Sequence, residues 1–171
     1  MTRSAASSDN LVPKAAAFEG SLALAGVALG WLFGTKPLAT LTWDPLAIAW
    51  GTAATLPMFA VLFCIVWLPW GPFARLLQIV DEMIQTFFRG ASLFDLAVVA
   101  LMAGIGEEVL FRGFVQAGLV RLTGSQMVGL IGAGVLFGLV HAITRTYAIL
   151  ATVVGIYLGL LWIYSGNLLA P

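Results

Sequence analysis

Five long apolar runs restrict what this chain can fold into more than any other feature. They cover residues 18–34, 46–68, 93–119, 127–143 and 147–164. The second run, for example, is long enough to cross a hydrocarbon core of about 30 Å as a helix that rises about 1.5 Å per residue. Only 9% of the 171 residues are charged, whereas a soluble domain carries about 25%, so lipid must take the place of water around this chain. The sequence therefore predicts an all-α, polytopic membrane helix bundle with about five transmembrane helices.

The segments outside these runs have distinct patterns. Residues 1–17 are polar and are expected to form an N-terminal tail, which leaves residues 18–171 as a single membrane-embedded domain. We interpret the first run as a retained span rather than a signal peptide, because further apolar runs follow it. Residues 73–88 alternate apolar and polar positions at helical spacing, which is typical of an amphipathic helix that lies in the membrane interface.

Basic residues in the short connections predict the orientation. With five spans, one side of the membrane carries Arg3, Lys14, Arg75, Arg89 and Arg145, and the other carries Lys36 and Arg121. The positive-inside rule then places the N-terminus in the cytoplasm, which we expect for a protein of the plasma (inner) membrane. The formal net charge is zero, and no basic patch indicates a nucleic-acid partner.

The third apolar run contains a polar cluster in its middle, formed by Glu107, Glu108 and Arg112. Three such groups near a bilayer centre cost about 8–10 kcal/mol on insertion scales. The apolar residues of the same run return about 4–8 kcal/mol, so its polar face must meet other helices or water. Charged residues inside spans are candidates for a functional site, although the same three could merely hold the bundle together.

Helix geometry predicts different roles for the two glutamates. Glu108 and Arg112 are four residues apart with the acid first, which is the favourable order for an ion pair. Glu107 is rotated by about 100° and is expected to point into a cavity, where its carboxylate can act as a general base. The only histidine, His141, lies near the end of the next run and shares a helical face with Phe137. Imidazole can orient a water molecule, share its proton or bind a metal.

Metal binding stays open at this point. Glu107 and His141 are the candidate ligands, and zinc is the candidate metal. A catalytic zinc generally takes three protein ligands and a water molecule, and no HExxH motif or cysteine pair is present. Activation of water by glutamate and histidine without a metal fits these residues at least as well.

The two motifs together resemble the CAAX prenyl protease and bacteriocin-processing family of intramembrane proteases. Glu107-Glu108-Val-Leu-Phe-Arg112 matches its first motif, and Phe137-Gly-Leu-Val-His141 matches its second. The resemblance covers about residues 93–171 and implies hydrolysis of a peptide bond in or beside the membrane. It implies that Glu107 and His141 activate the attacking water and that Glu108 and Arg112 support them. Members are often labelled metalloproteases.

One family feature is missing from this sequence. A third motif, a histidine followed four residues later by asparagine or a similar residue, normally comes shortly after a Gly-Asn-Leu-x-x-Pro stretch. Here Gly166-Asn-Leu-Leu-Ala-Pro171 ends the chain. The missing pair would be expected to stabilise the oxyanion, so we expect little or no proteolysis from the 171-residue chain. Either the sequence is interrupted or the chain is a defective member.

Three functions remain in competition. The first is an intramembrane endopeptidase, whose substrate by resemblance would be a membrane-associated or lipidated peptide: a prenylated tail, a bacteriocin leader or a membrane-anchored regulator. The second is a non-catalytic membrane scaffold or immunity protein that keeps the same fold. The third is a proton- or ion-coupled transporter, for which buried glutamates are also natural, although no inverted repeat is detectable. The sequence does not reveal the substrate, oligomeric state or organism.

Overall fold

A computed structural model describes residues 11–68 and 70–171 and confirms the all-helical fold. The helices are α1 (Leu11–Phe33), α2 (Pro45–Trp67), α3 (Pro72–Phe87), α4 (Leu93–Glu108), a π-helical segment η2 (Val109–Gln116), α5 (Ala117–Thr123), α6 (Gln126–Val140) and α7 (Arg145–Ser165). Three of the described helices, α1, α2 and α7, are long and apolar enough to cross a membrane. The helix α6 is apolar but has 15 residues, about 22 Å, which is less than a full hydrocarbon core.

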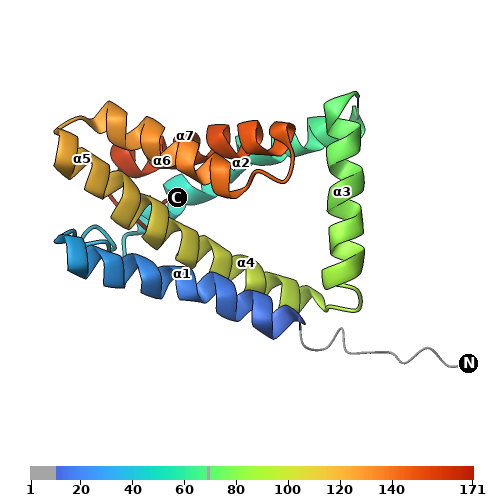
Figure 1. Cartoon of the computed structure of the whole chain (residues 1–171), viewed down its shortest axis with the longest axis horizontal. Helices are drawn as coiled ribbons and strands as arrows, with labels where there is room; N and C mark the ends of the chain where they lie inside the picture. The colour runs from blue at the N-terminus through green and yellow to red at the C-terminus, as the bar shows by residue number, and fades with distance from the viewer. Residues whose placement is uncertain (1–10, 69) are drawn as a thin grey trace, which may run out of the picture.

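The helices form two packed groups (Figure 1). In one group, α1 runs alongside α4 and η2; in the other, α6 packs against α7. Small residues make both contacts close: a Cβ atom at Gly106 would collide with the carbonyl oxygen of Glu19 in α1, and one at Gly138 would collide with the Thr152 side chain in α7. Two glycine pairs have GxxxG spacing, Gly134–Gly138 in α6 and Gly155–Gly159 in α7, and a Cβ atom at any of the four would crowd an atom of a neighbouring helical segment. The segment η2 contacts both groups, so the polar cluster lies between them.

The first helix begins earlier than predicted. Residues 11–17, which the sequence analysis assigned to a polar tail, are helical; residues 1–10 of that tail lie outside the described residues. Ala15, Ala16 and Ala17 have the highest helix propensity, and Pro13 is tolerated because first-turn N–H groups have no intrahelical partner. Helix propensity, rather than hydrophobicity, therefore accounts for the helical conformation of residues 11–17.

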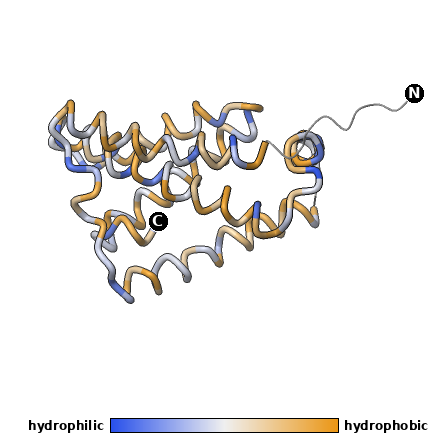
Figure 2. Tube along the Cα trace, turned by 90° about the horizontal axis from the view of Figure 1, so that it is seen from below, coloured by the Kyte–Doolittle hydropathy of each residue, from blue (hydrophilic) through white to orange (hydrophobic). Residues whose placement is uncertain are grey.

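The amphipathic helix α3 crosses the ends of the other helices. It stands roughly perpendicular to α1 and α4 (Figure 1), and its end-on view shows hydrophobic and hydrophilic residues on opposite sides (Figure 2). Val80, Met83, Ile84 and Phe87 are apolar and exposed. This is the arrangement expected of a helix that lies in the membrane interface.

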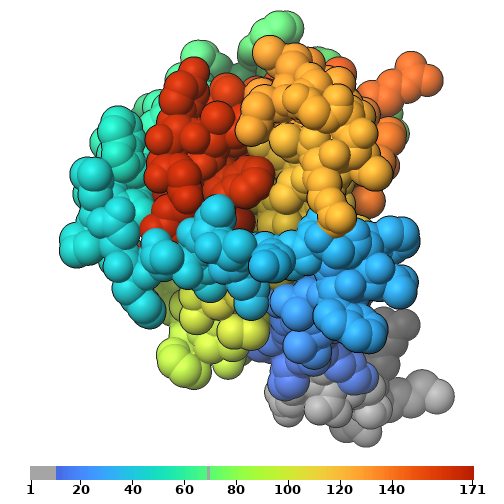
Figure 3. Space-filling view, turned by 90° about the vertical axis from the view of Figure 1, so that its left-hand side faces the viewer, coloured from blue at the N-terminus to red at the C-terminus, as the bar shows by residue number. Residues whose placement is uncertain are grey.

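The C-terminal segment closes the opposite end of the bundle. Residues 166–171 pack beside the loop between α1 and α2, as the space-filling view shows (Figure 3). The buried Asn167 donates to the Thr42 carbonyl (2.8 Å), and its side-chain oxygen accepts from the Thr42 N–H (3.3 Å). This contact ties the end of α7 to the chain before α2.

Candidate active site

The polar cluster sits where a regular α-helix gives way to a π-helix. The helical stretch from Leu93 to Thr123 is continuous, and Glu108 is its middle residue. It starts with a capping box, in which the Ser92 side chain accepts from the Asp95 N–H and Asp95 accepts from the Ser92 N–H. From Val109 to Gln116 the turns widen to the i→i+5 pattern, which is frequent at functional sites. The glutamates are therefore about as far from either end of this helical stretch as they can be.

Glu108 and Arg112 form a buried pair. The Arg112 guanidinium donates to Glu108 Oε1 at 2.7 Å, and the side chains are 1% (Arg112) and 10% (Glu108) exposed. Arg112 also donates to the Gly155 carbonyl of α7 (2.9 Å) and lies over the Phe137 ring, 5.1 Å from its centroid. The ion pair predicted from the four-residue spacing is present. Through its further contacts, Arg112 joins η2 to both α6 and α7.

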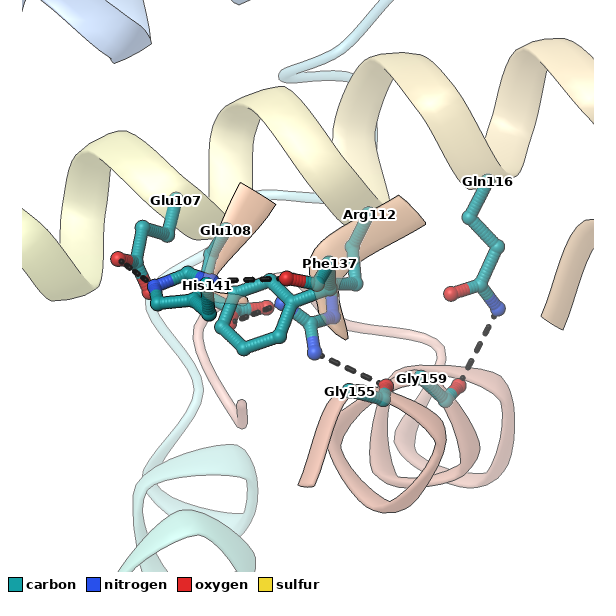
Figure 4. Close-up of polar contacts among 8 residues, drawn as sticks. All are labelled: Glu107, Glu108, Arg112, Gln116, Phe137, His141, Gly155 and Gly159. Carbon is teal, nitrogen blue, oxygen red and sulfur yellow. Dashed lines mark hydrogen bonds and ion pairs between the residues drawn. The ribbon is translucent and has the colours of Figure 1, made fainter. Parts of the chain in front are cut away.

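The other glutamate meets the histidine (Figure 4). Glu107 Oε1 lies 3.4 Å from His141 Nε2, and these side chains are 22% and 24% exposed. His141 caps the C-terminus of α6, and its ring lies 4.3 Å, centroid to centroid, from that of Phe137. Phe137 thus stands between the buried pair and the accessible pair. All four candidate residues from the sequence come together, as two pairs with different accessibility.

The hydrogen bonds of His141 fix the position of one proton. His141 Nδ1 lies 2.8 Å from the Phe137 carbonyl oxygen. A carbonyl can only accept, so Nδ1 must carry the hydrogen. In a neutral ring, Nε2 then presents a lone pair toward Glu107, and two acceptors face each other. A proton on one of them, or a water molecule between them, is required to make the contact favourable.

Two polar residues of this region, one buried and one half-buried, escaped the sequence analysis. Gln116 is 0% exposed and donates to the Gly159 carbonyl of α7 (3.3 Å), one turn beyond Arg112. Glu19 in α1 interacts electrostatically with Glu107 and His141, and its Oε2 is buried without a hydrogen-bond partner. Signals for both existed. Gln116 continues the four-residue spacing from Glu108 through Arg112, and Glu19 is the one acidic residue of the first apolar run.

The donor set of this region does not fit a complete catalytic zinc site. Glu107 and His141 supply two donors, and Glu108 is engaged by Arg112. Within residues 11–68 and 70–171, no group of three His, Cys, Asp or Glu side chains is arranged to hold a metal ion. A catalytic zinc generally needs three protein ligands. With two available donors, this region therefore lacks the third protein ligand of such a site.

Fold and composition together define a polytopic integral membrane protein with ionisable groups inside its bundle. Residues 89–171 match the family model described as Type II CAAX prenyl endopeptidase Rce1-like, and this part of the chain, which carries both motifs, is similar to that family. No curated protein and no solved structure gave a match. The matched segment runs from the end of α3 to Pro171, so α1 and Glu19 lie outside it.

Proposed function

We propose that this protein is an intramembrane endopeptidase in which Glu107 and His141 activate water. The observation that carries the proposal is the 3.4 Å separation between Glu107 Oε1 and His141 Nε2 on neighbouring helices. Contacts between catalytic groups are often long before substrate binds, and one water molecule can contact both groups at this distance. The partial exposure of both side chains supports access for water, whereas Glu108 and Arg112 are too enclosed to reach a substrate directly.

The reaction follows from these two groups. A water molecule between them loses a proton to the pair as its oxygen attacks the carbonyl carbon of a peptide bond. The C–N bond of the tetrahedral intermediate then breaks, and the proton passes from the pair to the leaving nitrogen. The products are a carboxylic acid and an amine. Glu108 and Arg112 position this site, since they hold η2 against Phe137 and α7.

The substrate class follows from the surroundings and from the family. The site lies among apolar helices, so its peptide must be membrane-associated, and the family's description adds a lipidated peptide as the first candidate.

We place the N-terminus of the chain on the cytoplasmic side of the plasma (inner) membrane. Two pockets support a common end for three of the basic residues. One pocket contains Arg75 and Arg145, and the other contains Arg89 beside the start of α1.

Isotope labelling tests the hydrolysis directly. The full chain in lipid nanodiscs is incubated in H₂¹⁸O with apolar peptides that do or do not carry an isoprenoid on a cysteine, and products are detected by mass spectrometry. We expect cleavage with one ¹⁸O in the new carboxylate, because the attacking oxygen comes from water. Glu107→Gln and His141→Gln should each reduce cleavage to the background rate. Cleavage equal in wild type and Glu107→Gln would overturn the proposal.

A non-catalytic scaffold is the second candidate function. It is supported by the contact between Glu107 and His141, which could also hold α6 against α4 without any chemistry. The scaffold predicts that Glu107→Ala still complements loss of the chain in cells, provided that the variant reaches the membrane in normal amounts. The endopeptidase predicts that it does not.

A further inference from the structure

Two arginines from distant parts of the chain share one pocket. This pocket of about 680 Å³ lies between the first turn of α3 and the turn that joins α6 to α7. Arg75 lines it on one side, and Arg145, with Thr144 and Thr146, lines it on the other. The contact between α3 and α7 brings these segments together.

No side chain in the described wall of this pocket carries a negative charge that would balance the two arginines. No acidic residue belongs to its wall. The ion pairs among residues 11–68 and 70–171 are Glu108–Arg112 and Glu107–His141, and neither involves Arg75 or Arg145. Both arginines are exposed, so their donors remain free to bind an anion.

The backbone adds to the same positive field. The helix α3 begins at Pro72 and α7 begins at Arg145, so both N-termini border the pocket, and neither helix has an acidic residue in its first turn. A helix N-terminus carries a partial positive charge, and this charge remains where the Thr144 hydroxyl accepts from the Tyr147 N–H at the start of α7. Arginine is unfavourable near such an end unless an anion compensates it. Two arginines beside two N-termini therefore indicate an anion site.

The location identifies the source of the anion. The helix α3 exposes apolar residues along its length and lies across the ends of the other helices (Figure 1), as an interfacial helix does. Trp70, just before it, is 69% exposed, and indole rings prefer the headgroup region. We propose that the pocket binds the phosphate of an anionic phospholipid headgroup from the leaflet on which α3 lies.

This site has a structural link to the candidate active site but does not depend on peptidase activity. The pocket wall begins at Ile143, two residues after His141. A phosphate held by Arg145 and the N-terminus of α7 restrains the turn that carries the imidazole. Binding of anionic lipid should therefore stabilise the chain even where no peptide is cleaved.

Native mass spectrometry of the full chain in detergent tests the proposal. Dioleoyl phosphatidylglycerol and dioleoyl phosphatidylcholine are titrated in parallel, and we expect the wild type to bind the anionic lipid at least about tenfold more tightly. The Arg75→Gln/Arg145→Gln variant should lose this preference. The Lys14→Gln/Arg89→Gln variant removes two exposed charges near the same end of the molecule and should keep it. Circular dichroism without added lipid shows whether each variant is folded.

Three results would overturn the inference. The first is an unchanged preference in Arg75→Gln/Arg145→Gln. The second is an equal loss in the Lys14→Gln/Arg89→Gln control, which would mean unspecific attraction of anionic lipid. The third is a rise in Tm with millimolar inorganic phosphate alone that equals the rise with dioleoyl phosphatidylglycerol, which would assign the pocket to a soluble anion.

Discussion

At the scale of single residues, two adjacent glutamates have different surroundings because a helix rotates each position by about 100° from the last. Glu108 faces the interior and meets Arg112, whereas Glu107 faces α6 and meets His141. A buried charge must be paired, since removal of one partner leaves the other uncompensated in an apolar environment. Glu107 is partly exposed and has no such requirement. In the function that we propose, Glu108 therefore serves stability and Glu107 serves the chemistry.

Arg112→Met should destabilise the protein by about 3–5 kcal/mol, because it leaves Glu108 buried and unpaired and removes the hydrogen bond to the Gly155 carbonyl. Unfolding by sodium dodecyl sulfate, followed by circular dichroism, measures the change. Glu107→Gln is the matched control and should stay within about 0.5 kcal/mol of wild type. Adding Glu108→Gln to Arg112→Met should recover part of the loss. Equal stability of Arg112→Met and Glu107→Gln would contradict this division.

The sequence was sufficient for contacts along one helix and insufficient for contacts between helices. The four-residue spacing predicted the Glu108–Arg112 pair, and the family resemblance predicted that His141 belongs with Glu107. Glu19 was missed because its proximity depends on how α1 packs on α4, which no periodicity encodes. Gln116 was missed although it continues the four-residue spacing of Glu108 and Arg112, because that spacing does not show that its partner is the Gly159 carbonyl of α7.

At the scale of helices, glycines decide how closely the bundle packs. Gly106 allows the backbone of α1 to approach α4 directly beside Glu107. Gly104, two residues earlier on the same helix, faces open space. Sequence alone makes these two glycines look equivalent, since both lie in one apolar run. Their difference arises from tertiary packing.

Gly106→Ala should destabilise the protein by about 1–3 kcal/mol, because its Cβ would collide with the Glu19 carbonyl and push α1 away. Gly104→Ala should instead be neutral or stabilising by up to about 1 kcal/mol, because alanine has the higher helix propensity. Thermal unfolding of both variants in the same detergent compares them. If the two alanines have the same effect, the close approach of α1 and α4 is wrong.

Helix bounds show the same limit of prediction. The apolar run 46–68 predicted α2, and the amphipathic pattern of residues 73–88 predicted α3, each to within one residue, since a Pro at the start fixes each helix. The run 127–143 outlasts α6 by three residues, because the chain turns at His141 while remaining apolar. The π-helical segment η2 was not predicted, since hydrophobic periodicity over eight residues does not distinguish π-helical turns from regular α-helical turns.

At the scale of the whole molecule, charge should set the orientation in the membrane. Lys14 lies near the start of α1 and Lys36 follows its end, so a single crossing separates them. In a Cys64→Ser background, which removes the one native cysteine, Lys36→Cys should react with a membrane-impermeant maleimide on intact cells. Lys14→Cys should react only after the cells are lysed, because the end with more basic residues stays in the cytoplasm. The reverse labelling pattern would place the N-terminus outside.

A double-mutant cycle tests most directly whether Glu107 and His141 act as one unit. The rate of ¹⁸O incorporation into peptide products is measured for wild type, Glu107→Gln, His141→Gln and the double variant. Groups that activate the same water are not additive, so each single variant should lose nearly as much rate as the double variant. If instead the two single losses multiply in the double variant, the residues contribute independently and the shared-water mechanism is contradicted.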